Sequence, residues 1–126
     1  MPVMNAIPGT DEGKPESPDP RPAVFRTVTP ETAIRMMAKD DRFVLLDVRT
    51  AREYDAGRIR GAGLIPHTEL AVRAPAELPD KDLTVFVYCH AGVRSLEAGS
   101  ILHGLGYARV FDVGGIVDWP EDAIEN

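Results

Sequence analysis

Two continuous apolar runs constrain the fold of this chain more than any other feature of its sequence. Residues 43–48 read FVLLDV and residues 83–88 read LTVFVY, without the alternation that marks a strand with one wet face. Such runs are typical of strands buried on both faces, as in parallel sheets covered by helices. Helical patterns separate the apolar runs, and this alternation favours the same architecture. The chain is therefore expected to adopt an α/β fold with a parallel sheet between layers of helices.

Three shorter strands complete a predicted five-stranded sheet, at residues 23–28, 64–65 and 109–113. The connecting segments predict a helix that starts after Thr29, one over residues 50–56, one or two turns over residues 68–74, and a final turn over residues 116–122. The helix after the second long apolar run has its apolar face at i, i+3, i+4 and i+7, on Ala98, Ile101, Leu102 and Leu105. In parallel sheets of this kind the functional site lies at the carboxyl ends of the strands.

The first 22 residues differ in composition from the rest of the chain. They hold six of the eleven prolines and few apolar residues. Such a segment cannot bury enough apolar surface to offset the entropy lost on ordering. We therefore expect residues 1–22 to form a flexible proline-rich tail and residues 23–126 to form one domain, since 126 residues suit a single domain.

Charge and hydropathy exclude several classes of protein. The chain carries 20 acidic against 14 basic residues, a net charge of −6, whereas nucleic-acid binders show a basic excess or stripe. No apolar run approaches the roughly 20 residues that span a bilayer. The N-terminus lacks the basic and apolar regions of a secretory signal. We expect a protein that neither binds nucleic acid nor spans a membrane, and that resides in the reducing cytoplasm.

Cys89 is the only cysteine, so the chain cannot form an internal disulfide or a cysteine-rich zinc site. The three histidines (His67, His90 and His103) are scattered, and the sequence predicts neither a metal site nor a cofactor. Any thiol chemistry must therefore use Cys89. A lone cysteine is more often a small core residue, but the residues around this one indicate another role.

Cys89 ends the second buried strand, and a short loop joins it to a helix. The loop comprises His90, Ala91, Gly92, Val93 and Arg94, followed by Ser95. Ala91 and Gly92 allow a tight turn, which directs backbone amides toward one point. The helix N-terminus contributes further amides and partial positive charge, and Arg94 adds a full charge. Together they predict an anion cradle with the sulfur at its floor, a setting that favours the thiolate and activates it as a nucleophile.

Three separated motifs resemble the rhodanese family. Cys89 to Ser95 matches its Cys-x-x-Gly-x-Arg-Ser active loop. Residues 45–49 (LLDVR), Glu53-Tyr54 and residues 57–62 (GRIRGA) are similar to its "Asp-Val-Arg…Glu-Tyr…Gly-His-Ile-Pro-Gly-Ala" signature, and residues 114–119 resemble its Gly-Gly…Trp element. The resemblance covers about residues 23–120 and implies a rhodanese-like three-layer fold.

The resemblance also implies a sulfurtransferase. In this family Cys89 would take a sulfane sulfur from a donor anion such as thiosulfate and become a persulfide. It would then pass the outer sulfur to cyanide, to a thiol or to an acceptor protein. The loop from His90 to Arg94 would stabilise the persulfide anion.

The chain departs from the family signature at two positions. Arg58 stands where the signature has His, and Arg60 where it has Pro. We expect a structural or surface role for both, and an effect on the choice of anionic donor is the alternative.

Other polar residues near the predicted site have a supporting role. Asp47 follows a buried strand, and its carboxylate is expected to accept N–H groups of its own turn or to pair with Arg49. Ser95 is expected to support the loop. His90 has a direct chemical role only as the less favoured alternative, and Trp119 is expected to pack as core or as a lid on the loop.

Two other functions compete with an active sulfurtransferase. Cell-cycle dual-specificity phosphatases resemble this fold, but their loop has five residues between Cys and Arg, whereas four separate Cys89 from Arg94. The shorter loop suits one sulfur better than a tetrahedral phosphate. The second alternative is a dedicated persulfide carrier or regulatory binding module for one partner protein. Retention of both Cys89 and Arg94 argues against an inactive module.

Overall fold

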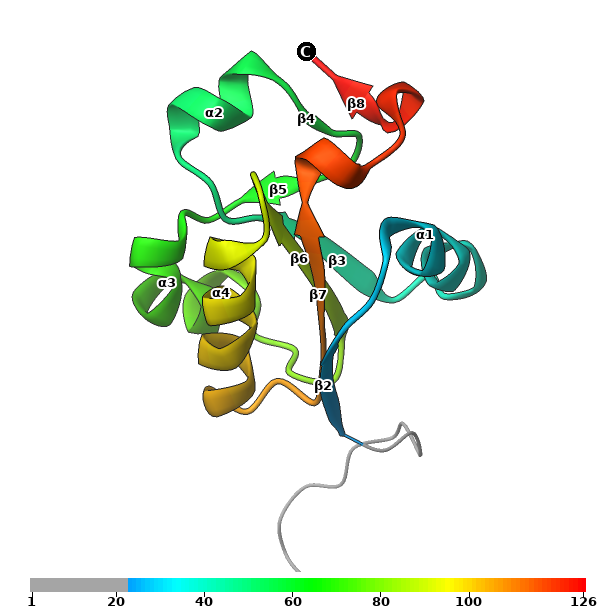
Figure 1. Cartoon of the computed structure of the whole chain (residues 1–126). Helices are drawn as coiled ribbons and strands as arrows, with labels where there is room; N and C mark the ends of the chain where they lie inside the picture. The colour runs from blue at the N-terminus through cyan, green and yellow to red at the C-terminus, as the bar shows by residue number, and fades with distance from the viewer. Residues whose placement is uncertain (1–22) are drawn as a thin grey trace, which may run out of the picture.

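A computed structural model describes residues 23–126, and the predicted flexible tail of residues 1–22 lies outside this range. A five-stranded sheet forms the centre of the domain (Figure 1). All neighbouring strands in it are parallel, and their order is β2-β7-β6-β3-β5. The strands are β2 (Val24–Thr27), β3 (Phe43–Asp47), β5 (Gly63–Leu64), β6 (Thr84–Cys89) and β7 (Arg109–Gly115). The predicted parallel five-stranded sheet is confirmed.

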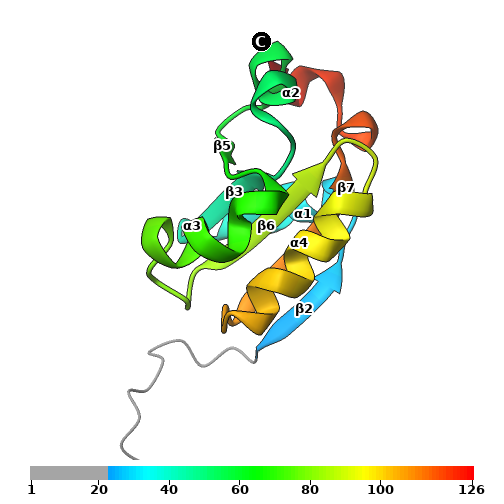
Figure 2. The same cartoon turned by 90° about the vertical axis from the view of Figure 1, so that its left-hand side faces the viewer.

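Helices cover both faces of the sheet, which confirms the three-layer architecture. The helices α3 (Leu70–Glu77) and α4 (Val93–Gly104) lie on one face, and α1 (Pro30–Lys39) lies on the other (Figure 1). Figure 2 shows α4 running across the face of the sheet over β6 and β7, with which it makes most of its contacts. Among residues 23–126, no helix is both long enough and apolar enough to cross a membrane.

Alternation along β6 divides the core into two halves. Val85, Val87 and Cys89 face α3 and α4, whereas Phe86 and Tyr88 face α1. The α1 half is aromatic, because Phe86 stacks on Phe111 at a centroid distance of 5.5 Å. Residues on both faces of β6 are buried, as expected for a continuous apolar run.

Two helix starts follow directly from the sequence. Thr29 caps α1 by accepting the N–H of Thr32, and Pro30 occupies its first turn. The helix α2 (Ala51–Ala56) begins with a reciprocal capping box between Thr50 and Glu53, and it ends at Gly57 as predicted.

The structure differs from the predicted elements in three places. The predicted turns at residues 68–74 are a 3₁₀ turn (His67–Glu69) followed by α3, which runs through Pro75 to Glu77. The strand β7 continues two residues beyond the predicted 109–113 because its glycines pass close to the Cys89 loop. The third difference is a two-residue antiparallel ribbon of β4 (Arg58–Ile59) and β8 (Ile124–Glu125). Its strands are too short to carry an apolar pattern.

The carboxyl ends of the sheet strands bring distant residues together. In the strand register Asp47 lies opposite Tyr88, and Cys89 lies opposite Gly115. Two 3₁₀ turns, Ile116–Asp118 and Glu121–Ala123, then lead the chain from β7 to β8. The helix α2 and the β4–β8 ribbon lie beyond this edge of the sheet (Figure 1).

Candidate active site

Cys89 is the last residue of β6, and it is only 1% exposed. The backbone N–H of Gly92 donates a hydrogen bond to its Sγ at 3.0 Å. Gly92 has φ +104°, a left-handed conformation that favours glycine, and it immediately precedes the first turn of α4. The sulfur therefore lies at a tight turn before a helix N-terminus, which is where the sequence placed it.

The second glycine of the Gly114-Gly115 pair allows β7 to approach this loop. A Cβ on Gly115 would lie 2.1 Å from the carbonyl oxygen of His90 and 2.6 Å from Cα of Ala91. No side chain fits there without moving the loop. The N–H of Val117 also donates to the carbonyl of His90, at 3.4 Å. Thus β7 and the 3₁₀ turn that follows it contact the backbone of the loop and fix its position.

Arg94 forms a two-pronged ion pair with Glu53, a residue that our sequence analysis did not place in the site. Its Nη1 and Nη2 lie 2.7 and 3.0 Å from the two carboxylate oxygens of Glu53. These hydrogen bonds lower the pKa of Glu53 to about 2, against its partial burial. Glu53 raises the pKa of Arg94 first of all, and the charge of Cys89 raises it further. The guanidinium is therefore held in a fixed orientation by Glu53.

Asp47 and Arg49 form a second buried pair, the contact that the sequence predicted for Asp47. Its carboxylate accepts the backbone N–H of Arg49 at 2.8 Å and the Arg49 side chain at 2.7 Å. Arg49 also donates to the carbonyl of Gly57 at 2.6 Å. This network connects the end of β3 to the end of α2. It thereby fixes the helix that carries Glu53.

Of the remaining loop residues, one is buried and hydrogen-bonded within the turn, and three are exposed to solvent. Ser95 is buried, and its Oγ donates to the carbonyl of Gly92 at 3.1 Å, so it supports the turn. His90, Ala91 and Val93 lie on the exposed side of the loop. Within residues 23–126, no hydrogen bond joins the side chain of His90 to Cys89. The geometry therefore offers the backbone N–H of Gly92 to the sulfur rather than an imidazole.

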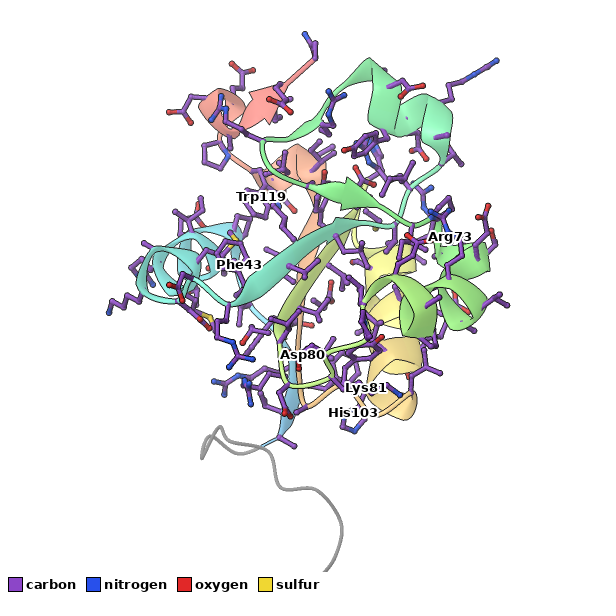
Figure 3. All side chains as sticks on the ribbon, turned by 180° about the vertical axis from the view of Figure 1, so that it is seen from behind. Phe43, Arg73, Asp80, Lys81, His103 and Trp119 are labelled. Atoms are coloured by element: carbon purple, nitrogen blue, oxygen red, sulfur yellow. The ribbon has the colours of Figure 1, made fainter. Side chains whose placement is uncertain are left out.

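In the described part of the chain, the side chains of Trp119, His67 and His103 form no hydrogen bond with Cys89. Trp119 is buried with its ring 6.0 Å from that of Tyr88, so it packs in the core on the α1 side. Figure 3 shows His103 at the opposite end of the molecule from Trp119. There His103 stacks on Phe25, whereas His67 lies 3.8 Å from Glu97. In the part of the chain that the structure describes, no three His, Cys, Asp or Glu side chains are grouped to hold a metal.

A hollow of about 300 Å³ opens beside the loop. His90 and the turn after β7 form one side, α2 forms another, and the segment around β8 closes the third. Glu53 and Arg49 line it, but both are engaged in the ion pairs described above. Most of the remaining wall is apolar: Ala56, Ile116, Val117 and Ile124.

Comparisons with known proteins agree with this geometry. A family model described as "Rhodanese-like domain" matches residues 29–122. The chain is 41% identical over 73 residues to "Thiosulfate sulfurtransferase PspE" of Escherichia coli, covering 58% of this chain and 70% of that protein. It is 36% identical over 90 residues to a "Sulfurtransferase" of Allochromatium vinosum, covering 71% of this chain and 82% of that protein.

Solved structures show the same relationship. A rhodanese from E. coli with bound anions superposes with a TM-score of 0.58 at 39% identity, covering 61% of this chain and 93% of that one. A rhodanese-like domain from Anabaena superposes with a TM-score of 0.71 at 26% identity, covering 79% and 78%. The chain therefore belongs to the family of rhodanese-like domains, and it is a sulfurtransferase.

Proposed function

We propose that Cys89 carries the transferred sulfur as a persulfide. In the first half-reaction the Cys89 thiolate attacks the outer, sulfane sulfur of thiosulfate. A new S–S bond forms at Cys89, the S–S bond of thiosulfate breaks, and its electron pair leaves with sulfite. The reaction needs no oxidant, because the sulfane sulfur arrives already at the oxidation level at which it is transferred.

In the second half-reaction a thiophilic acceptor attacks the outer sulfur of the persulfide. With cyanide the products are thiocyanate and the Cys89 thiolate, and with a thiolate they are a new persulfide and the same Cys89 thiolate. In both cases the bond to Cys89 breaks and its electron pair returns to the Cys89 sulfur. The enzyme is thereby restored for another cycle.

The hydrogen bond from the Gly92 N–H to Sγ of Cys89 is the observation that carries this mechanism. A backbone amide at a helix N-terminus stabilises negative charge on Sγ in the thiolate that attacks the donor and in the thiolate that is released when the outer sulfur leaves. Glu53 fixes the orientation of Arg94, and the guanidinium N–H groups beyond that pair can donate to a donor that arrives as an anion. The name of the E. coli relative, a thiosulfate sulfurtransferase, supports thiosulfate as the donor.

Steady-state kinetics test the mechanism. Sulfite must leave before the acceptor reacts, so thiosulfate and cyanide should give parallel double-reciprocal lines, and Cys89→Ala should be inactive. Intersecting lines would mean that donor and acceptor bind together and would contradict an obligatory persulfide. Residual turnover in Cys89→Ala above the uncatalysed rate would assign the chemistry to another group.

A further inference from the structure

The two arginines that depart from the family signature both hold the segment around β8. The backbone N–H of Arg60 donates to the carbonyl of Ala123 at 2.8 Å, and its Nη2 donates to the carbonyl of Asp122 at 2.9 Å. Nε of Arg58 lies 3.4 Å from a carboxylate oxygen of Glu125. We refer to Arg58, Arg60 and the β4–β8 ribbon together as the clasp.

The clasp also connects this segment to α2. The guanidinium of Arg58 lies 4.8 Å from the centre of the Tyr54 ring, and its Nη1 donates to the Tyr54 carbonyl at 3.2 Å. The Tyr54 hydroxyl in turn donates to the carbonyl of Ala62 at 2.5 Å. One arginine therefore contacts both α2 and β8, and residues of both elements line the hollow beside the Cys89 loop.

The segment held by the clasp determines the width of that hollow. Ile124 of β8 and Asn126, the residue after β8, line it together with His90 and Val117. The approach to α2 is close, because a Cβ on Gly57 would lie 3.0 Å from Oδ1 of Asn126. A movement of this segment would change the space next to the loop without changing the loop itself.

We propose that the hollow binds the carbon skeleton of a small uncharged thiol acceptor, and that the clasp limits the size of the thiol that fits. This inference rests on the persulfide mechanism proposed above. The thiolate sulfur of the acceptor attacks the outer sulfur of the Cys89 persulfide, and the electron pair of the broken bond stays on Cys89. The apolar wall suits carbon, and the charges of Arg49 and Glu53 are already neutralised by their partners. A volume of about 300 Å³ corresponds to roughly ten water molecules, which suits a thiol of a few heavy atoms.

The test compares two thiols of different size in a variant that restores the family signature. Arg58→His removes the Glu125 contact. Arg60→Pro removes both the guanidinium and the N–H that bonds Ala123. We expect the ratio of kcat/KM for the larger uncharged thiol 1-thio-β-D-glucose to that for 2-mercaptoethanol to rise about tenfold over wild type, the order expected when one steric misfit is relieved. The same ratio in both proteins would overturn the size limit.

Two further variants keep the test decisive if the double variant folds poorly. Ile124→Ala widens the hollow and leaves both arginines in place, so it should raise the ratio in the same direction. Arg42→Ala is the matched control, since its ion pair with Asp80 lies at the opposite end of the molecule (Figure 3), and the ratio should stay at the wild-type value. An Ile124→Ala protein with the wild-type ratio would contradict the role of the hollow.

Loading of sulfur separates this inference from the mechanism on which it rests. Incubation with thiosulfate alone involves no acceptor, so all three variants should form the persulfide as wild type does. Wild type that forms no persulfide would overturn the proposed function itself. Normal loading with an unchanged thiol ratio would overturn only the size limit.

Discussion

The two ends of the sheet each contain a buried arginine beside a hollow, but only one end has the chemistry of a site. At the carboxyl ends of the strands Arg49 is 5% exposed and pairs with Asp47. At the amino ends Arg109 is 3% exposed; its Nε donates to Oγ1 of Thr84 at 3.3 Å and its Nη2 donates to the carbonyl of Asp82. The hollow at the amino end is the larger, at about 540 Å³ against 300 Å³. Neither a buried arginine nor a large hollow is therefore sufficient to identify a site.

The two ends of the sheet differ because helix N-termini lie at the carboxyl ends of the strands. In a parallel α/β fold each helix begins after the carboxyl end of a strand, so its amides and partial positive charge lie at that edge. Cys89 stands there, before the first turn of α4. The hollow at the other edge is lined half by apolar side chains such as Val24 and Phe86 and half by polar ones, and the C-terminal end of α1 lies beside it. Arg109 thus connects the starts of two strands through hydrogen bonds, whereas Arg49 and Arg94 pair with Asp47 and Glu53 beside the Cys89 loop.

The largest effect on the rate is expected from Gly115→Ala at the carboxyl end. Its Cβ would overlap the His90 carbonyl, so the loop must move, and a shift of about 1 Å in a reacting group costs about 100-fold in rate. Single-turnover persulfide formation measures this loss. Gly104→Ala is the matched control, since nothing lies within 4 Å of the added methyl group. Its rate should equal that of wild type, and equal losses in both variants would contradict a specific role for Gly115.

A smaller effect is expected from Glu53→Gln, which leaves Arg94 charged but removes its ionised partner. A charge-assisted hydrogen bond of about 1.5 kcal/mol corresponds to about a tenfold fall in kcat. KM for thiosulfate should not rise, because the guanidinium remains available to the donor. Asp80→Asn, which neutralises the exposed partner of Arg42, is the control and should leave both constants unchanged. A rise in KM without a fall in kcat would show that Glu53 acts in binding rather than in positioning Arg94.

At the amino end, Arg109→Met should lower the stability of the protein without lowering the rate of persulfide formation. Removing the guanidinium leaves buried oxygen acceptors without a donor, and the free energy of unfolding should fall by about 3 kcal/mol. Urea denaturation measures this loss. The rate of persulfide formation per folded molecule should stay at the wild-type value. A reduced rate in folded protein would show that the amino end does contribute to the site.

The smallest effect concerns the pH dependence of the Glu53–Arg94 pair. Since the pKa of Glu53 falls from an ordinary 4.5 to about 2 on folding, its stabilisation is complete above pH 4.5 and is lost as the pH falls toward 2. Partial exposure of both side chains limits the contribution to about 1 kcal/mol. The free energies of unfolding of wild type and Glu53→Gln should therefore differ at pH 7 and converge toward pH 2. A constant difference would mean that the pair does not titrate as described.

Most of the fold could be predicted from local sequence patterns. The apolar runs around Leu46 and Phe86, the cap at Thr29 and the stop at Gly57 each act over a few residues, so periodicity and capping suffice to predict them. The loop around Cys89 is equally local, and its residues lie where the sequence indicated. The support that Asp47 receives from Arg49 spans only two residues and was also predicted.

Contacts between distant residues could not be predicted in the same way. Glu53 and Arg94 are 41 residues apart, and Arg60 and Asp122 are 62 apart. Glu53 was recognised only as part of a family motif, because its local role as the capping-box residue of α2 gives no indication of a second partner. The β4–β8 ribbon has two residues on each side and no periodicity to detect. Long-range ion pairs of this kind become visible only when the topology places their elements side by side.

The most direct test of the account is the intact mass of the protein before and after sulfur transfer. Incubation with thiosulfate should add the mass of one sulfur atom to wild type, and subsequent cyanide should remove it with one equivalent of thiocyanate. Arg109→Met should behave as wild type, whereas Cys89→Ala should gain nothing. A mass increase that persists in Cys89→Ala, or a wild-type protein that turns over without ever carrying the sulfur, would contradict a persulfide on Cys89.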